Sequence, residues 1–244
     1  MSIQSKLLNG SIVNWPELIF PYASIWQQLA RMYRHSSFES NLRHWVNRSI
    51  NDLLGDIYDG NIWKTFKDTP FDENSGLFFS EETANSHLGL VLNVDWFQPY
   101  SNTTHSTGVI YAAIVNLPRE IRFKRENMLI LDILPSPNKA NLHKINHYLS
   151  LIVDELISLW QGTKLDSIVE CSEGKIIHTV LILISCDIPA ALKVCGHISA
   201  LVSCHRCNKK ANYVNNKHNF SGMRNMNEWF VPKNSAIHRQ NAIE

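Results

Sequence analysis

Two aspartates and one pair of cysteines are the residues of this sequence whose types and positions could carry chemistry. Asp95 ends the aliphatic run LGLVLNVD, and Asp187 ends the run KIIHTVLILISCD. Carboxylates held close together repel each other unless a divalent cation lies between them, and Mg²⁺ and Mn²⁺ prefer such oxygen ligands. Bridging carboxylates hold the ions that activate a nucleophile and stabilise the leaving oxygen at a phosphodiester. If the fold brings Asp95 and Asp187 together, we expect a divalent-metal site suited to phosphodiester chemistry.

Strand-end aspartates also have ordinary structural roles. Asp187 stands two residues before Pro189, where it suits the N-cap of a short helix. A further acid, Asp132 in MLILDIL, competes for the metal role, and we expect it at an edge or on the surface. From the residues alone, the metal site and the helix cap both stay open for Asp187.

Cys204 and Cys207 form a Cys-x-x-Cys pair in the fragment CHRC. Two thiolates at this spacing provide half of a tetrahedral zinc site, and the alternative is a pair of reduced thiols in a tight turn. The sequence has five cysteines, an odd number, which argues against a disulfide framework.

The composition fits an ordinary folded domain with a helical extension. Of the 244 residues, 44% are hydrophobic and 18% are charged, and the formal net charge is +1. No global basic field therefore indicates a nucleic-acid partner, and any contact with DNA must be local. One candidate for phosphate contacts is a basic run that we expect to be mainly solvated, formed by Arg119, Arg122, Lys124 and Arg125. The other candidates lie beside the cysteine pair and are Arg206, Lys209 and Lys210.

The sequence shows no pattern typical of secretion or of a membrane span. No charged start followed by a long apolar run is visible, and the longest aliphatic stretch, Val180 to Ile188, is too short to cross a bilayer. We therefore expect an intracellular protein without a membrane partner.

Hydrophobic periodicity predicts a helical start followed by a mixed sheet. Residues 1–68 are expected to be a helical N-terminal extension, and residues 69–86, rich in turn formers and acids, a linker. After them, three strands at short spacing predict an antiparallel meander, followed by a helix and a further strand. The expected ranges are strands 88–97, 106–118 and 128–134, helix 141–160, strand 175–185, a short helix at 189–197 and a candidate fifth strand at 199–204.

This element order is that of a ribonuclease H-like mixed α/β sheet, expected over residues 87–207. In that plan the first and fourth strands lie side by side, so Asp95 and Asp187 converge although they are far apart in the sequence. Residues 204–244 are expected to be a cysteine knuckle with a polar C-terminal tail.

Several strings resemble the Tnp2 transposases of CACTA-type DNA transposons, especially their fungal branch. They cover most of the chain and are DIYDGNIWKTF, LGLVLNVDWFQPY, GVIYAAIVNLPREIRFKREN, LHKINHYLSLIVDELISLWQG and SCDIPAALKVCGHISALVSCHRC. The resemblance implies that Asp95 and Asp187 are the first two acids of a DDE/D triad, which cuts DNA and transfers strands with Mg²⁺ or Mn²⁺. It also implies transposon-end DNA as the partner and the nucleus as the location, and it leaves room for a homo-oligomer.

The resemblance also bears on the cysteine pair. Related cut-and-paste transposases place a Cys-x-x-Cys shortly after the second acid and complete a zinc site with downstream histidines. His218 is then a candidate third zinc ligand, beside Cys204 and Cys207. His238 is another candidate without favourable spacing, and His205, inside the pair, is expected to point away.

The sequence departs from the family pattern at the third acid. A DDE enzyme normally carries it on a late helix, but Glu228 and Glu244 are the only acids after the cysteine pair, and neither stands in a convincing helix. We therefore expect a truncated transposase that is inactive alone. The alternatives are a non-catalytic DNA-binding or oligomerising module derived from a transposase and a product without function.

Overall fold

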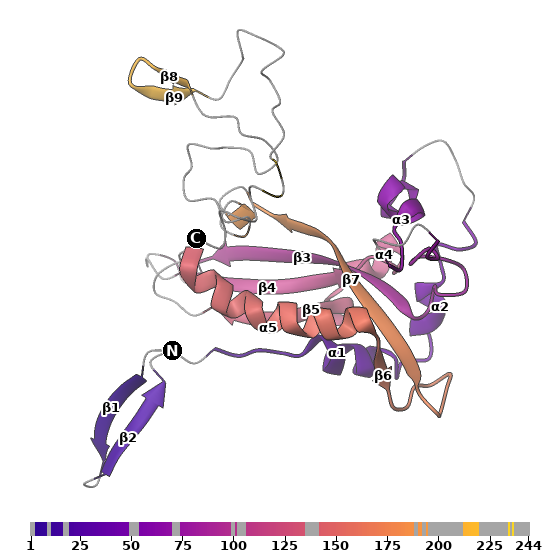
Figure 1. Ribbon diagram of the computed structural model, residues 1–244, viewed down its shortest axis with the longest axis horizontal. Coiled ribbons are helices and arrows are strands. Elements are labelled where there is room, and N and C mark those ends of the chain that lie inside the picture. The colour runs from indigo at the N-terminus through magenta and orange to yellow at the C-terminus, as the bar shows by residue number, and fades with distance from the viewer. Residues whose placement is uncertain are drawn as a thin grey trace.

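A five-stranded sheet forms the centre of the fold (Figure 1). β3, β4 and β5 are antiparallel neighbours, whereas β7 runs parallel to β3 and β6 runs antiparallel to β7. The expected meander is confirmed, as is the place of the fourth expected strand beside the first. In order across the sheet the strands are β5 (Met128–Leu134), β4 (Thr107–Ile114), β3 (His87–Phe97), β7 (Lys175–Cys186) and β6 (Thr163–Leu165).

The protein is described by a computed structural model. It describes residues 3–8, 11–16, 20–48, 54–69, 74–98, 101, 106–134, 142–187, 190–191, 194, 212–219, 234 and 236.

Side chains alternate between the two faces of the sheet, as the pleat of a β-strand requires. The even-numbered residues of β3 from Leu88 to Val94 are buried on one face. The odd-numbered residues point to the other face, which we call the Asp95 face. Its three rows of paired residues are Leu183, Val91, Ala113 and Met128; then Ser185, Asn93, Tyr111 and Ile130; then Asp95, Val109 and Ile133.

Helix α5 (Leu142–Gln161) covers the face opposite Asp95. Its stripe of Ile145, Tyr148, Ile152 and Leu159 is buried in one core cluster with the strands. Parallel neighbours in a sheet need a crossover connection, and α5 with β6 forms the crossover between β5 and β7. The helix expected at 141–160 is confirmed to within one residue at each end.

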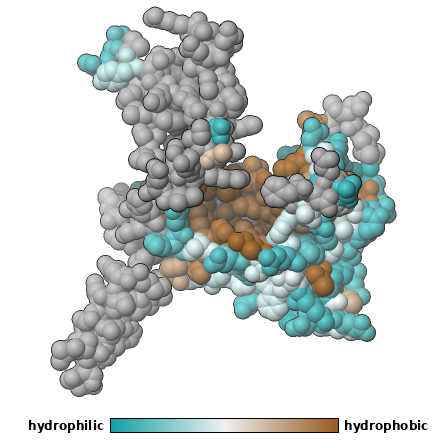
Figure 2. Space-filling view, viewed as in Figure 1, coloured by the Kyte–Doolittle hydropathy of each residue, from teal (hydrophilic) through white to brown (hydrophobic). Residues whose placement is uncertain are grey.

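The Asp95 face is partly apolar and exposed. Phe97, Ile130, Ile133 and Leu183 all belong to this face and are exposed. Figure 2 shows the other side of the molecule, on which α5 lies in front of the sheet, and hydrophobic residues gather in the middle of that view.

The helical expectation is wrong for residues 3–16, which form a β-hairpin. Strands β1 (Ile3–Leu8) and β2 (Ser11–Pro16) are antiparallel, and Leu8 pairs with Ser11. The two residues between the strands in the sequence are Asn and Gly, the dipeptide most typical of two-residue hairpin loops. This local turn signal outweighs the apolar spacing that suggested a helix.

From residue 25 the helical expectation holds in part. The helical segments are α1 (Ile25–Met32), α2 (Phe38–Leu42), the 3₁₀ turn η1 (Ile57–Asp59) and α3 (Asn61–Thr65). Ile25, Leu29 and Leu42 are fully buried in the same cluster as the sheet. Helices α1 and α2 therefore complete the core of the sheet, while the domain limits expected from the sequence stay predictions.

Glu155 of α5 holds the N-terminus of α1. The backbone N–H groups of Ile25 and Trp26 donate to its carboxylate at 2.9 Å each, and the hydroxyls of Tyr22 and Ser24 donate to it as well. Burial acts to raise the pKa of Glu155, but these hydrogen bonds outweigh burial and the pKa lies below its usual value. A carboxylate at a helix N-terminus is also favoured by the helix dipole.

A second hydrophobic cluster packs beside the start of the sheet. Tyr58, Trp63, Phe78 and Phe79 are buried in it together with Val115, which follows β4. Phe78 and Phe79 belong to the segment expected to be a linker, so this part of that segment is packed against the fold.

Arg122 is buried, although the basic run to which it belongs was expected to be mainly solvated. It lies in the short helix α4 (Arg119–Arg122), which precedes the 3₁₀ turn η2 (Arg125–Asn127), and it is 5% exposed. Its guanidinium forms an ion pair with Asp56 at 2.8 Å and donates to the Tyr58 hydroxyl and the Leu117 carbonyl. Arg122 therefore ties the second cluster to the sheet, while Arg119, Lys124 and Arg125 are exposed.

Near the C-terminus, β8 (Asn212–Val214) and β9 (Lys217–Asn219) form a second hairpin. Asn215 and Asn216 between them have φ of 52° and 60°, and two positive φ values are what the tight turns of two-residue hairpins require. The candidate strand at 199–204 and most of the short helix expected at 189–197 lie outside the described residues. Within the described ranges, no helix is long and apolar enough to cross a membrane.

Candidate metal site

Asp95 and Asp187 come together at the same end of two neighbouring strands. The last register pair between β3 and β7 joins Val94 to Cys186, and each aspartate is the next residue along its strand. The strands are parallel and neighbouring strands lie about 4.8 Å apart, so the two acids stand side by side. Both side chains are exposed. The convergence expected from the sequence is present in the fold.

An irregularity in β7 sets this register. Leu90 pairs with Leu181, but Val91 pairs with Leu183, so Ile182 is one additional residue on β7. Without this additional residue, Asp95 would lie level with Cys186 and Asp187 would be one position further along. β-Bulges re-aim side chains in this manner and are common beside functional sites.

Asp187 also caps the segment that follows it. Its Oδ1 accepts a hydrogen bond from the Ala190 N–H at 2.8 Å, and its backbone carbonyl accepts one from Ala191 at 2.8 Å. The N-cap interpretation is therefore correct, and it does not exclude a metal. A carboxylate has two oxygens with about four lone-pair sites, so one capping bond leaves capacity for a cation.

Three polar side chains form the next row of the Asp95 face. Ser185, Asn93 and Tyr111 stand in register on β7, β3 and β4. Burial and then the charge of Asp95 raise the pKa of the Tyr111 phenol, which indicates that the phenol lies near that carboxylate. The Oδ1 of Asn93 is buried and has no hydrogen-bond partner in the described part of the chain.

Sequence reasoning missed this row, although a signal was present. In NVD and in SCD, a polar residue stands two positions before the acid and interrupts an aliphatic run. Because residues i and i+2 of a strand share a face, Asn93 and Ser185 could have been assigned to the same side as the two acids.

Asp132 does not join the two acids, because it lies on the opposite face of the sheet. It pairs with Ile110 on β4, whereas Asp95 pairs with Val109. Asp132 was expected at an edge or on the surface: it does lie on β5, an edge strand of the sheet, but it is only 1% exposed, so the surface position is wrong. Burial raises its pKa to about 7.

The zinc ligands expected from the sequence cannot be brought together from the described residues. Cys204 and Cys207 lie outside them, and His218 is a β9 residue whose backbone pairs with that of Tyr213. Among the residues that the structure describes, no group of three or more His, Cys, Asp and Glu residues could hold a metal ion.

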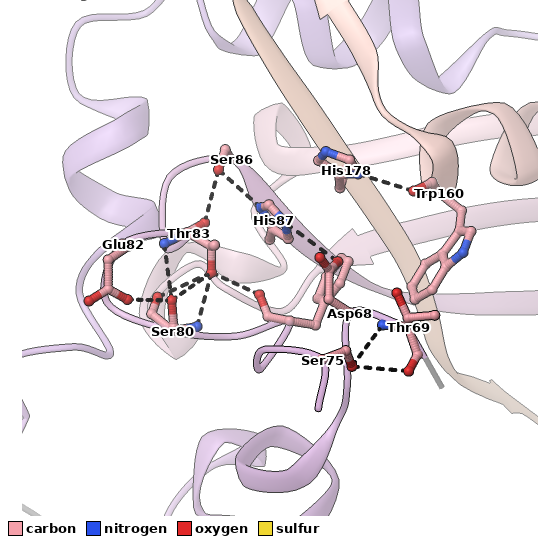
Figure 3. Close-up of polar contacts among 11 residues, drawn as sticks. Asp68, Thr69, Ser75, Ser80, Glu82, Thr83, Ser86, His87, Trp160 and His178 are labelled. Atoms are coloured by element: carbon pink, nitrogen blue, oxygen red, sulfur yellow. Dashed lines mark hydrogen bonds and ion pairs between the residues drawn. The ribbon is translucent and has the colours of Figure 1, made fainter. Parts of the chain in front are cut away.

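A histidine pair marks the other end of the same two strands. The rings of His87 and His178 stack with centroids 4.6 Å apart, and Figure 3 shows His87 beside Ser86 and His178 beside Trp160. Burial, and then the charge of His178, lower the pKa of His87 to about 4. Stacked rings do not direct their nitrogens at one ion, so this pair is a packing feature at the far end from the acids.

Comparison with known proteins identifies the family of the chain. The model of the family described as transposase family tnp2 matches residues 51–243, a range that includes the central sheet and both aspartates. No curated protein and no solved structure matches the chain. Because the family match covers well over half of the sequence, the chain belongs to the tnp2 family of transposases.

Proposed function

We propose that Asp95 and Asp187 are two of the metal ligands of a DDE/D transposase site that cuts DNA and transfers strands. The observation that carries the proposal is the parallel register of β3 and β7, which sets the two acids side by side where these neighbouring strands end. Membership of the tnp2 family makes DNA the partner, since transposases act on DNA.

The residues at these strand ends fit a hard divalent cation such as Mg²⁺ or Mn²⁺. Two exposed carboxylates supply oxygen ligands, and their mutual repulsion is relieved when a cation binds between them. A bound ion would supply charge stabilisation at the phosphate and activate a water or a 3′-hydroxyl. The role of Asp95 and Asp187 is to hold and orient that ion at the ends of β3 and β7.

The strand order supports a ribonuclease H-like fold as part of this proposal. Along the chain, three antiparallel strands are followed by α5 and then by β7, which is parallel to the first of them. Across the sheet, these strands stand in the order β5, β4, β3 and β7. In this arrangement the first and fourth strands deliver the two acids. A nuclear location, a homo-oligomer and a place in the CACTA branch belong to the same proposal.

The test is calorimetric titration of the purified chain with Mn²⁺. Asp95→Asn and Asp187→Asn should each weaken Mn²⁺ binding by about tenfold or more, because each removes a charged ligand. Asp154→Asn is the matched control, since Asp154 is exposed on α5 and remote in sequence from both strand ends. Unchanged Mn²⁺ affinity in both site variants would refute the metal site.

The same variants separate an enzyme from a DNA-binding module. With transposon-end DNA, Asp95→Asn should retain DNA affinity and abolish any Mg²⁺-dependent cleavage. The lack of strand transfer by this chain alone stays a prediction, and robust cleavage by the unmodified chain would contradict it. DNA affinity without any metal binding would instead favour the non-catalytic module.

We also propose that Cys204 and Cys207, with His218 as a further candidate, bind Zn²⁺. Two thiolates at this spacing suit a tetrahedral zinc site. Elemental analysis of protein purified under reducing conditions should find zinc, and a Cys204→Ser, Cys207→Ser variant should lose it. A chain that contains no zinc would overturn this assignment.

A further inference from the structure

Asn93 occupies a particular place relative to the two acids. It stands two residues before Asp95 on β3, so the two side chains point to the same face, with their Cα atoms about 6.6 Å apart along the strand. Across the sheet it is level with Ser185, which stands two residues before Asp187. Asn93 therefore lies one row behind Asp95 on the same face of the sheet.

The hydrogen bonding of Asn93 is incomplete. Its Oδ1 is buried and has no hydrogen-bond partner among the described residues. A buried polar atom without a partner is costly, and such an atom in a native fold calls for a missing water, ion or ligand.

Asn116 shows what a structural asparagine looks like in this fold. It is fully buried, its Oδ1 accepts from the Gly89 N–H at 2.8 Å, and its Nδ2 donates to the His87 carbonyl at 2.9 Å. Both ends of that amide are used by the backbone. Among the described residues, no backbone group makes such a contact with the Oδ1 of Asn93.

The other buried oxygens without partners lie away from the acids. Glu39 Oε1 belongs to helix α2. Both carboxylate oxygens of Asp132 and the hydroxyl of Thr179 belong to residues on the opposite face of the sheet. Among the described residues, Asn93 Oδ1 is the unpartnered oxygen that shares a strand and a face with Asp95.

We propose that Asn93, through Oδ1, is a third oxygen ligand of the divalent ion held by Asp95 and Asp187. This inference rests on the proposed metal site. Amide carbonyl oxygens bind Mg²⁺, Mn²⁺ and Ca²⁺ alongside carboxylates. The charges also balance, because two carboxylates neutralise one divalent cation and the neutral amide adds a ligand without adding repulsion.

Mn²⁺ titration by calorimetry tests the proposal with two substitutions. Asn93→Leu keeps a similar volume and removes the oxygen, so Mn²⁺ binding should weaken by about tenfold or more. Asn93→Asp replaces the amide by a third carboxylate, so Mn²⁺ should bind more tightly than to the unmodified chain. Ile130→Leu, a change in the same row of the Asp95 face at an exposed β5 residue without a side-chain oxygen, is the control and should leave Mn²⁺ affinity within about twofold.

The outcomes distinguish this inference from the metal site itself. If Asp95→Asn abolishes Mn²⁺ binding while Asn93→Leu binds as the unmodified chain does, Asn93 is not a ligand and the acid pair stands. If Asp95→Asn and Asp187→Asn bind Mn²⁺ normally, the metal site fails. Should Asn93→Leu not fold, Asn93→Asp decides alone, because a folded Asn93→Asp chain with unimproved Mn²⁺ affinity refutes the proposal.

Discussion

At the residue scale, one side-chain type serves two purposes on opposite faces of the sheet. Asp95 is exposed near the end of β3, where its side chain can meet a cation. Asp132 is buried on β5, and burial raises its pKa from 3.8 to about 7. The environment of each residue, rather than its type, separates the metal candidate from the buried acid.

The buried acid gives a prediction about pH. The folded state holds the proton of Asp132 more tightly than the unfolded chain does, so this residue lowers stability as pH rises from about 4 to about 7. Asp132→Asn removes the charge, and its free energy of unfolding at pH 8 should exceed that of the unmodified chain by about 2–4 kcal/mol. Denaturant unfolding at several pH values measures the difference.

The same series contains its own control. At pH 3 the Asp132→Asn and unmodified chains should differ little, because pH 3 lies below both the unfolded pKa of 3.8 and the folded pKa of about 7, and the carboxyl is then mostly neutral in both states. Asp154→Asn, on the exposed surface of α5, should leave the pH dependence unchanged. An Asp132→Asn chain that is less stable than the unmodified one at pH 8 would contradict this account of the residue.

The two acids could be predicted from the sequence because each ends an aliphatic run and strand ends are visible in a sequence. The burial of Asp132 and of Arg122 could not, since both depend on contacts with segments far away in the chain. Tyr22 pairs with Asp132, and Asp56 with Arg122. Single polar residues follow no periodic pattern, so their partners in distant segments cannot be predicted from the sequence.

At the element scale, one carboxylate of α5 ties the N-terminus of α1 to that helix. Glu155 accepts hydrogen bonds from the backbone N–H groups of Ile25 and Trp26, the first two residues of α1. N–H groups in the first turn of a helix have no acceptor within their own helix. Glu155→Ala should lower the free energy of unfolding by about 2–4 kcal/mol, because it leaves several donors unsatisfied.

The neighbouring residue supplies the comparison. Asp154→Ala removes a carboxylate from an exposed position of the same helix and should change the free energy of unfolding by less than about 0.5 kcal/mol. Chemical denaturation of both variants at pH 7 measures the contrast. Equal effects of the two substitutions would show that Glu155 does not hold α1.

Elements with strong periodicity could be predicted from the sequence, and register could not. Helix α5 and strands β3, β4, β5 and β7 follow from their apolar patterns. The additional residue at Ile182 leaves no mark in an aliphatic run, yet it brings Asp187 level with Asp95. The hairpin at residues 3–16 differs from the predicted helix, although the Asn-Gly dipeptide between its strands is a typical hairpin signal.

At the scale of the whole molecule, the segment before the sheet belongs to the core. Ile25, Leu29, Tyr33 and Leu42 are fully buried with the strands, and Lys175 of β7 forms an ion pair with the buried Glu39. Removing these side chains would expose the apolar side of α5 and of the sheet to water. The N-terminal helices therefore act as a cover for the fold.

A shortened chain tests this role. A chain that begins at Ser86 should lose cooperative thermal unfolding, because it lacks the buried side chains of α1 and α2. A chain that begins at Phe20 removes the β1–β2 hairpin alone and should retain a cooperative transition. Circular dichroism during heating gives both results, and cooperative unfolding of the chain from Ser86 would show that the sheet folds without its N-terminal cover.

The central claim is that Asp95 and Asp187 contact the same divalent ion, and iron-mediated cleavage of the protein tests it most directly. Fe²⁺ bound in place of Mg²⁺, with ascorbate and peroxide, generates radicals that cut the backbone beside the ion. We predict cuts next to both Asp95 and Asp187, suppressed by excess Mg²⁺ and absent from the Asp95→Asn chain. Cuts at other positions, or cuts beside Asp187 that persist in Asp95→Asn, would contradict a shared site.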